Sequence, residues 1–185
     1  MNRFTDKVVV ITGAGSGIGA ACAQRMYDEG AYIVIVDASA EGLERTAKNL
    51  DKSRVLSGVL DVTAPKAVQA FIDETRTRLG ALHGLINSAG IKGVGNVIDT
   101  DLDNWKAVMS VNLDGTFLMC QAFARAVKDD TDSRAIVNIS SGAGIMGVPQ
   151  RLPYVASKFG VTGITRTMGR ELGAYQPSKE FGDFN

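Results

Sequence analysis

The feature that most constrains this chain is the alternation of short, almost purely apolar runs with longer amphipathic stretches. The apolar runs are rich in Val and Ile and nearly continuous, as expected for strands that are covered on both faces. We predict strands over Val8–Thr12, Ile33–Asp37, Val55–Asp61, Leu85–Asn87 and Ala135–Ser140. Helical patterns cover Gly17–Glu29, Glu41–Asn49, Ala64–Leu79, Leu102–Val127 (one helix or two) and Pro153–Gly173. This order predicts an α/β fold with a doubly wound parallel sheet and helices on both faces.

Composition limits the classes of function. Lys plus Arg and Asp plus Glu both number 20, so no basic excess favours nucleic acid or an anionic membrane surface. The start of the chain lacks the apolar stretch of a signal peptide. The sequence also has no apolar run of about 18 residues, so a membrane span is not predicted. Cys22 and Cys120 lie in helix-like apolar patterns and are expected to be reduced core residues. We therefore expect a cytoplasmic protein. No metal site is expected, since the single histidine, His83, is placed at a loop or strand edge.

A glycine-rich loop, Thr12–Gly19, joins the first predicted strand directly to a helix. Two patterns fit it, G-x-G-x-x-A from Gly15 and G-x-x-x-G-x-G from Gly13. Glycine permits positive φ and a close approach of the backbone to pyrophosphate, and the helix N-terminus offers free N–H groups. A tight turn without any ligand could contain the same glycines, so the position between strand and helix carries the argument. We predict a Rossmann-type dinucleotide site that includes Gly13, Ser16, Gly17, Ile18 and Gly19.

The second predicted strand ends in Asp37. An acidic side chain at this point is placed to accept the ribose hydroxyls of an adenosine and would repel a 2′-phosphate. No Lys or Arg stands at Ser16, Ala38 or Ser39 to receive such a phosphate. NAD is therefore favoured as the cofactor, with NADP as the alternative.

Polar or glycine-rich clusters follow the other predicted strands as well, at Asp61, Asn87–Gly90 and Ser140–Ser141. Ligands of open α/β sheets bind outside the carboxyl ends of the strands, so a single crevice explains all of these clusters. Tyr154 and Lys158 come next, at a spacing that puts both on one face of a helix. An adjacent ammonium favours the phenolate, which proton exchange with an alcohol or carbonyl requires. Taken alone, such a pair could equally be a solvated helix face.

Together these motifs resemble the short-chain dehydrogenase/reductase family. Residues 5 to 175 follow the pattern of this family in order. The loop Thr12–Gly19 resembles its T-G-x-x-x-G-x-G motif, and Asn87–Gly90 resembles its N-N-A-G motif with Ser88 in place of the second Asn. The resemblance implies a catalytic set of Asn112, Ser141, Tyr154 and Lys158. It further implies cofactor contacts from Asp61 and Val62 beside the adenine and from Asn87, Ala89, Gly90, Tyr154 and Lys158.

Within the catalytic set, the resemblance implies that Tyr154 is the acid/base and that Lys158 binds the nicotinamide ribose and tunes the tyrosine. Ser141, rather than Ser140, would position the substrate oxygen, because its spacing to Tyr154 fits the family. Asn112 would help to hold a proton-relay water; as a mid-helix Asn it could otherwise cap or kink its helix.

The resemblance stops after residue 175. Segment 176–185 is polar and contains neither the strand nor the Pro-Gly turn that family members have next. We therefore expect one domain over 1–175 and an atypical tail over 176–185, in a truncated or frame-altered chain of low activity. The strand Ala135–Ser140 would then be an uncovered sheet edge.

These observations predict an NAD-linked oxidoreductase that interconverts a secondary alcohol and a ketone by hydride transfer. The alternative is a non-catalytic module that binds nucleotide or a partner; a hydrolase using Ser141 is disfavoured, because no G-x-S-x-G elbow is present. The substrate is expected to be a small alcohol or ketone in a pocket lined by the loops Ile91–Thr100 and Gly142–Leu152. The helices Leu102–Val127 and Pro153–Gly173 resemble those through which family members form dimers and tetramers, so a homo-oligomer is expected.

Overall fold

The computed structural model describes residues 2–48 and 50–174. Its helices and strands follow each other as β1 (Val8–Thr12), α1 (Gly17–Asp28), β2 (Tyr32–Asp37), α2 (Ala40–Ala47), β3 (Val55–Val59), α3 (Pro65–Leu79), β4 (Gly84–Asn87), α4 (Leu102–Met109), α5 (Gly115–Val127), β5 (Ala135–Asn138) and α6 (Leu152–Ala174). The predicted alternation of strands and helices is confirmed. The polar tail predicted over 176–185 lies outside the described residues.

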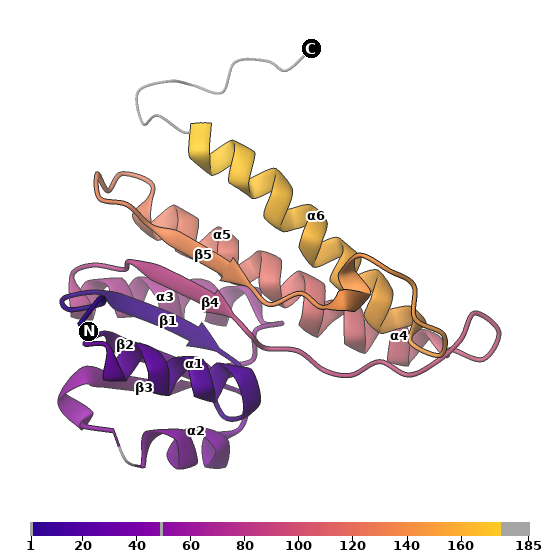
Figure 1. Cartoon of the computed structure of the whole chain (residues 1–185), viewed down its shortest axis with the longest axis horizontal. Helices are drawn as coiled ribbons and strands as arrows, with labels where there is room; N and C mark the ends of the chain where they lie inside the picture. The colour runs from indigo at the N-terminus through magenta and orange to yellow at the C-terminus, as the bar shows by residue number, and fades with distance from the viewer. Residues whose placement is uncertain (1, 49, 175–185) are drawn as a thin grey trace.

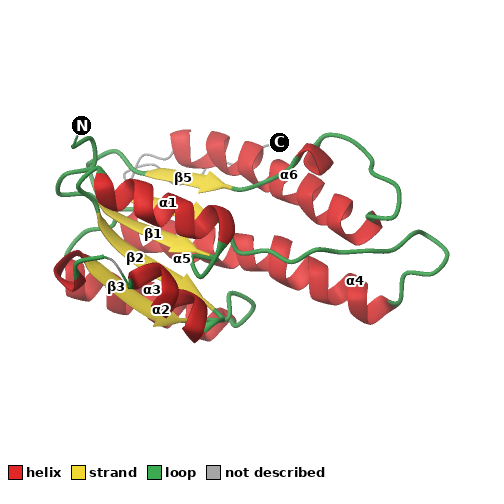
Figure 2. Cartoon of the chain, turned by 60° about the horizontal axis from the view of Figure 1, so that its bottom comes forward, coloured by secondary structure: helices red, strands yellow, loops and turns green. Residues whose placement is uncertain are grey.

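The strands form one parallel sheet in the order β3-β2-β1-β4-β5 (Figure 1), and Figure 2 shows β1, β2 and β3 side by side. The central strand β1 is buried along its whole length, because it is paired on both sides and covered on both faces. The outer strands expose apolar side chains, with Val59 of β3 62 % and Val137 of β5 49 % exposed. In the part of the chain that the structure describes, β5 pairs with β4 alone and is the expected sheet edge.

Helices cover both faces of the sheet (Figure 1). Because successive strand residues point to opposite faces, β1 contributes to two cores. Val9 and Ile11 pack in a cluster with residues of α1 and α2, whereas Val8 and Val10 belong to a cluster with residues of α3 and α5. Burial of each such aliphatic side chain contributes about 1.5–3 kcal/mol. The doubly wound α/β fold predicted from the sequence is confirmed.

Several element boundaries differ from the predictions. The strands that start at Val55 and Ala135 end two residues early, at Val59 and Asn138. One more hydrogen bond joins each to its neighbour, from the N–H of Leu60 to Asp37 and from the N–H of Ile139 to Asn87. After Leu60 the chain turns at Asp61, whose carboxylate accepts hydrogen bonds from the backbone N–H and the hydroxyl of Thr63, each at 2.8 Å. The stretch predicted as one helix or two is α4, a π-helical segment over Ser110–Asp114, and α5.

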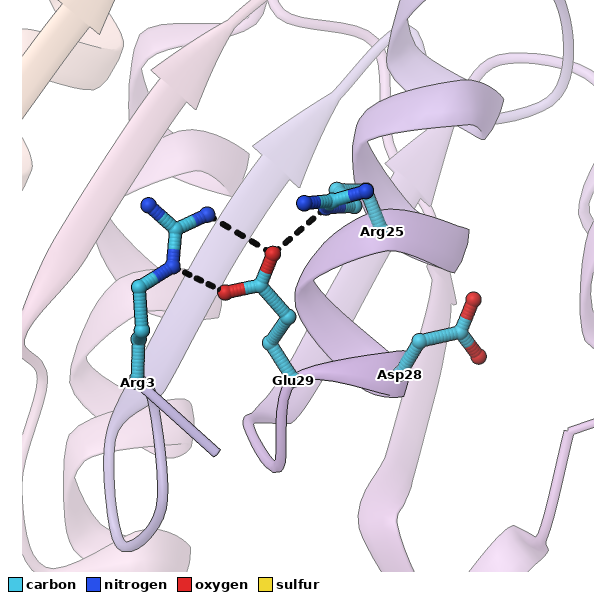
Figure 3. Close-up of a pocket in the computed structure, with 4 residues that line it drawn as sticks. All are labelled: Arg3, Arg25, Asp28 and Glu29. Carbon is cyan, nitrogen blue, oxygen red and sulfur yellow. Dashed lines mark hydrogen bonds and ion pairs between the residues drawn. The ribbon is translucent and has the colours of Figure 1, made fainter. Parts of the chain in front are cut away.

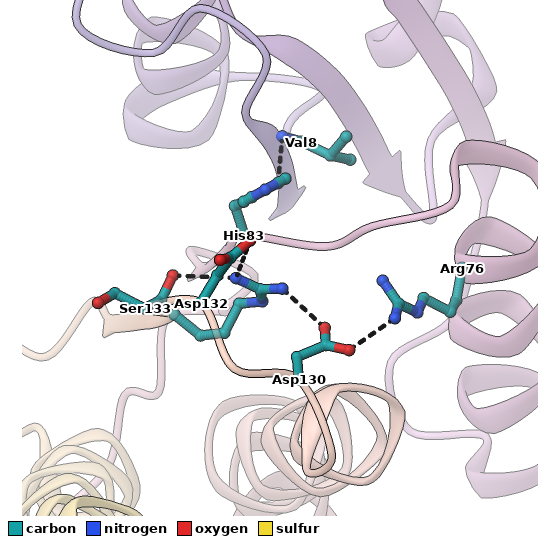
Figure 4. Close-up of polar contacts among 7 residues, drawn as sticks. Val8, Arg76, His83, Asp130, Asp132 and Ser133 are labelled. Carbon is teal, nitrogen blue, oxygen red and sulfur yellow. Dashed lines mark hydrogen bonds and ion pairs between the residues drawn. The ribbon is translucent and has the colours of Figure 1, made fainter.

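His83 lies immediately before β4, at the strand edge where it was predicted. Its Nδ1 accepts a hydrogen bond of 3.0 Å from the backbone N–H of Val8 and so fixes the start of β1 (Figure 4). Burial lowers the pKa of His83, and the charges of Lys7 and Arg134 act in the same direction. The carboxylate of Asp130 accepts from Arg76 and Arg134 at 2.7 and 2.8 Å. These contacts tie α3 to the segment that enters β5.

Both cysteines are free thiols, as predicted; Cys120 is buried in α5 and Cys22 is partly buried in α1. Among the described helices, none has both the length and the apolar character that crossing a membrane demands. The described residues also contain no group of three or more His, Cys, Asp or Glu that could hold a metal ion.

Candidate active site

A cavity of about 500 Å³ lies at the carboxyl ends of the strands. Its lining comes from loops that are far apart in sequence and that the parallel sheet brings to one edge. The lining residues are Gly13, Ser16, Gly17, Ile18, Asp37, Ala38, Leu60, Asp61, Val62, Ser88, Ala89, Gly90, Ile91, Lys92, Val111, Ile139, Ser140, Tyr154 and Lys158. The single crevice expected from the strand ends is therefore present.

At two positions of the glycine loop after β1 the neighbouring backbone is so close that a larger residue would not fit. Gly13 has a φ of +62°, and a Cβ there would lie 2.7 Å from the backbone nitrogen of Ala89. A Cβ on Gly19 would collide with the carbonyl of Gly13. These two glycines thus bring β1, the start of α1 and the end of β4 into contact.

The start of α1 is left open toward the cavity. Its N-cap, Ser16, makes no side-chain capping hydrogen bond, and the first turn contains no acidic residue. Gly17 has a φ of +53°, and a Cβ there would meet nothing within 4 Å. Backbone N–H groups of a first helical turn attract anions when no side chain satisfies them. This end of the cavity therefore fits the pyrophosphate of a dinucleotide.

Asp37 is held at the cavity by two backbone donors. Its carboxylate accepts hydrogen bonds from the N–H of Gly15 at 2.9 Å and from the N–H of Ser39 at 2.8 Å. Gly15 is required for this approach, since a Cβ there would lie 2.9 Å from the Asp37 Cγ. Each carboxylate oxygen has a further lone pair, so the fixed side chain can also accept hydroxyl donors from a ligand.

Asp61 and Val62 line the cavity beyond Asp37. The hydrogen bonds from Thr63 hold the pKa of Asp61 below its usual range. After β4, Ala89 and Gly90 also line the cavity. The Oγ1 of Thr12 accepts from the backbone N–H groups of Ser88 and Ala89, both at 3.1 Å, and so fixes this turn to the end of β1.

Asn87, predicted as a cofactor contact, lies away from the cavity lining. Its side chain is buried in the core, where Nδ2 donates to the Sγ of Cys120 at 3.2 Å and to the Oδ1 of Asn138 at 2.9 Å. Burial raises the pKa of the Cys120 thiol to about 11. Asn87 therefore links β4, β5 and α5.

Tyr154 and Lys158 both line the cavity, on the first turns of α6. The Nζ of Lys158 lies 5.7 Å from the centroid of the Tyr154 ring. This ammonium donates a hydrogen bond of 2.7 Å to the carbonyl of Ile139, and the residue is only 6 % exposed. Burial lowers the pKa of Lys158. The predicted helical pairing of the two side chains is thus present.

Asn112 is fully buried in the π-helical segment. Its Oδ1 accepts from the N–H of Ile91 at 2.8 Å, and its Nδ2 donates to the carbonyl of Ile91 at 3.0 Å and to the Oγ of Ser157 at 3.1 Å. A Cβ on Gly90 would lie 3.2 Å from the Asn112 Oδ1 and 3.8 Å from the Lys158 Nζ. Asn112 consequently fixes the loop after β4 next to the ammonium.

The two loops expected to line a substrate pocket are joined to each other. Gly95 pairs with Arg151 in an isolated parallel bridge, in which the N–H of Gly95 donates to the carbonyl of Gln150 at 3.1 Å and the N–H of Leu152 donates to the carbonyl of Gly95 at 3.0 Å. A Cβ on Gly93 would lie 3.0 Å from the backbone nitrogen of Tyr154. The loop after β4 therefore packs directly on the start of α6.

Comparison with known proteins decides the family. The sequence profile described as "short chain dehydrogenase" matches residues 7–176. The chain belongs to the short chain dehydrogenase family.

Curated members of this family include a D-threitol dehydrogenase of Mycolicibacterium smegmatis, 38 % identical over 92 % of this chain and 66 % of that protein. A levodione reductase of Leifsonia aquatica is 38 % identical over 94 % of this chain and 66 % of its own. The chain thus spans about two thirds of the length of these relatives.

Solved structures of the family superpose closely on this chain. The crystal structure of a levodione reductase has a TM-score of 0.88 at 38 % identity, covering 94 % of this chain and 69 % of that one. An actinorhodin polyketide ketoreductase with NADPH has a TM-score of 0.87 at 32 % identity, covering 93 % and 68 %.

Of the two candidate serines, Ser140 lines the cavity. Its Oγ is bonded to the carbonyl of Lys158 at 3.2 Å and to the Oγ1 of Thr162 at 3.0 Å. Ser141, which the family pattern favours, is exposed and caps the short turn Gly142–Gly144 by accepting from the N–H of Ala143 at 3.2 Å. The hydroxyl of Ser140 thus has two partners within the protein, whereas that of Ser141 has one, and Ser141 is not among the lining residues.

Sequence reasoning omitted several lining residues from the site, namely Ala38, Leu60, Ser88, Val111, Ile139 and Ser140. Most of them are direct neighbours of the predicted residues at a strand end, and this adjacency was the available signal. Val111 is an exception, because only the packing of the π-helical segment against the loop after β4 places it in the lining.

Proposed function

We propose that this chain is an NAD-dependent oxidoreductase that interconverts a secondary alcohol and a ketone. The observation that carries the proposal is the common cavity shared by the glycine loop, Asp37, Tyr154 and Lys158. The relatives named a D-threitol dehydrogenase and a levodione reductase support the same class of reaction.

NAD is proposed rather than NADP because of the charge at the adenosine end of the cavity. The charged residues that line this end, Asp37 and Asp61, are both acidic, and they oppose a 2′-phosphate. The Asp37 carboxylate is preorganised by its two backbone donors to accept ribose hydroxyls. The relative solved with NADPH shows that a member of the family takes the phosphorylated cofactor, so the discrimination depends on local residues such as these.

Each residue of the catalytic end has a defined part in the proposal. The nicotinamide of the bound cofactor accepts or donates the hydride. During oxidation the Oη of Tyr154 takes the proton of the substrate hydroxyl, and during reduction it returns a proton to the carbonyl oxygen. Lys158 provides a positive charge near the phenol, Ser141 holds the substrate oxygen, and Asn112 keeps the loop after β4 in place.

A spectrophotometric screen tests the proposal, with NAD and a panel of secondary alcohols in one direction and NADH and ketones in the other. We expect turnover that Tyr154→Phe lowers by about a thousandfold, because the acid/base is lost. Tyr32→Phe removes the same atom at the start of β2, outside the cavity lining, and should retain the rate. A protein that binds NADH but turns over no member of either panel would instead be the non-catalytic module.

We further propose a homo-oligomer that forms through the helices α5 and α6. Phe117 of α5 is 44 % exposed and Phe159 of α6 is 46 % exposed, and such side chains are common at subunit interfaces. Light scattering should give a molecular mass that is a multiple of the chain mass, and Phe159→Asp should lower this measured mass. A cytoplasmic location stays a prediction from the residues.

A further inference from the structure

Charge is distributed unevenly along the cavity. The charged residues of its lining are Asp37 and Asp61, which follow β2 and β3, and Lys92 and Lys158, which belong to the loop after β4 and to α6. The adenosine end is thus acidic and the catalytic end is basic. Lys158 already has a partner within the protein, since its ammonium is buried and donates a hydrogen bond to the carbonyl of Ile139. Lys92 is the exposed cation of the catalytic end.

Lys92 lines the same cavity as Tyr154 and lies close to the start of α6. It is bonded to Gly93, where a Cβ would lie 3.0 Å from the backbone nitrogen of Tyr154. Consecutive Cα atoms are about 3.8 Å apart, so the Lys92 side chain starts close to the first turn of α6. The bridge between Gly95 and Arg151 fixes this loop against α6. The same bridge places Arg151 beside Gly95, outside the cavity lining.

Neither Lys92 nor Arg151 is neutralised by the described part of the protein. None of the ion pairs among residues 2–48 and 50–174 includes Lys92 or Arg151. The carboxylates nearest in sequence to Lys92 have other partners. Asp99 accepts from the Nδ2 of Asn96 at 2.8 Å, and Asp101 accepts from the N–H of Asn104 at 2.7 Å.

We propose that the substrate carries an anionic group, a carboxylate in the simplest case, that pairs with Lys92 and is supported by the charge of Arg151 on the neighbouring loop. This inference rests on the proposed alcohol–ketone chemistry and names its substrate class. Ile91, Val111 and Ile139 line the same end of the cavity and provide apolar contacts for the carbon skeleton. The group that reacts at Tyr154 and the group that binds Lys92 are therefore separate parts of one molecule.

Matched pairs of a hydroxy monocarboxylic acid and its methyl ester test the proposal, since each pair differs by one negative charge. For wild type we expect kcat/KM with NAD to be at least about tenfold higher for the acid than for the ester. Lys92→Met should lower this ratio about tenfold, Arg151→Met should lower it less, and Lys92→Arg should retain it. Lys128→Met, which removes the same charge from the exposed end of α5, should leave the ratio at the wild-type value.

A ratio near or below one in wild type, or an unchanged ratio in Lys92→Met, would overturn the proposal. If no pair is turned over, the catalytic proposal is in question but this one is still measurable. The melting temperature in the presence of NAD should then rise more with the acid than with the ester, and this difference should disappear in Lys92→Met. Equal shifts for acid and ester would overturn the inference independently of catalysis.

Discussion

Two hollows of nearly equal size lie at opposite ends of β1 and differ in how their polar groups are satisfied. One, of about 520 Å³, is lined by Arg3, Arg25, Asp28 and Glu29 (Figure 3). The other, of about 500 Å³, lies at the carboxyl ends of the strands. In the first, both oxygens of Glu29 are paired with Arg3, and Arg25 donates to one of them. In the second, the start of α1 and Lys92 lack such partners in the described residues. Volume alone therefore does not identify a ligand site; polar groups without partners do.

The hollow at Glu29 is a structural brace. Glu29 follows α1, and its carbonyl accepts from the N–H of Phe4 at 3.0 Å. The hydrogen bond from Arg3 is the largest influence that lowers the pKa of Glu29, to about 2, with Arg25 acting in the same direction. These contacts fasten the segment before β1 to the end of α1. Substitutions at the Glu29 hollow should consequently leave NADH binding unchanged, whereas substitutions at the cavity should weaken it.

The largest expected effect is that of Gly19→Ala at the cavity. The new Cβ would collide with the carbonyl of Gly13, so the loop must move and α1 must shift. We expect a loss of about 3 kcal/mol of unfolding free energy and no detectable NADH binding. Urea unfolding and NADH fluorescence measure the two quantities. Gly163→Ala is the matched control on α6, where a Cβ meets nothing within 4 Å; it should be neutral or stabilising.

Asp37→Ser should weaken NADH binding by about tenfold to a hundredfold, because charge-assisted hydrogen bonds to the ribose are lost. The affinity for NADPH should fall less, which narrows the preference between the two cofactors. Asp28→Ser makes the same change at the other hollow and should leave both affinities intact. A preference for NADPH in wild type would contradict the assignment of Asp37.

Gly17→Ala should have a moderate effect on both stability and NADH binding. Its Cβ has free space in the protein, but the φ of +53° is unfavourable for Ala, at a cost of about 1–2 kcal/mol. The methyl group would also occupy the approach to the start of α1, so NADH binding should weaken about tenfold. Calorimetric titration checks this, and an unchanged affinity would place the phosphates elsewhere.

Glu29→Gln should have the smallest effect on NADH affinity, namely none, while it lowers the melting temperature by a few degrees. The folded-state pKa of Glu29 lies near 2, below that of an unfolded carboxyl. Its contribution to stability is therefore complete above the ordinary pKa of Glu and is lost as the pH falls toward about 2. In this acidic range the wild type should lose more stability than Glu29→Gln. Parallel profiles of stability against pH for the two proteins would disprove the bracing role of Glu29.

The parallel sheet and the cavity could be predicted because they follow from local patterns. Apolar runs identify buried strands, and the parallel arrangement then brings Asp37, Gly90 and Lys158 to one edge. The bridge between Gly95 and Arg151 could not be predicted, since it depends on the tertiary placement of two irregular loops. The same holds for Asn87, whose side chain lies in the core rather than at the cavity. Periodicity likewise does not reveal the π-helical segment around Asn112, which depends on packing against Ile91 and Ser157.

A crystal structure of the protein with bound NAD tests the central claim most directly, because both hollows are visible in one experiment. The account predicts the adenosine ribose at the Asp37 carboxylate, the pyrophosphate at the start of α1, and the nicotinamide beside Tyr154 and Lys158. Density for the dinucleotide between Arg3 and Arg25, or a nicotinamide turned away from Tyr154, would contradict it.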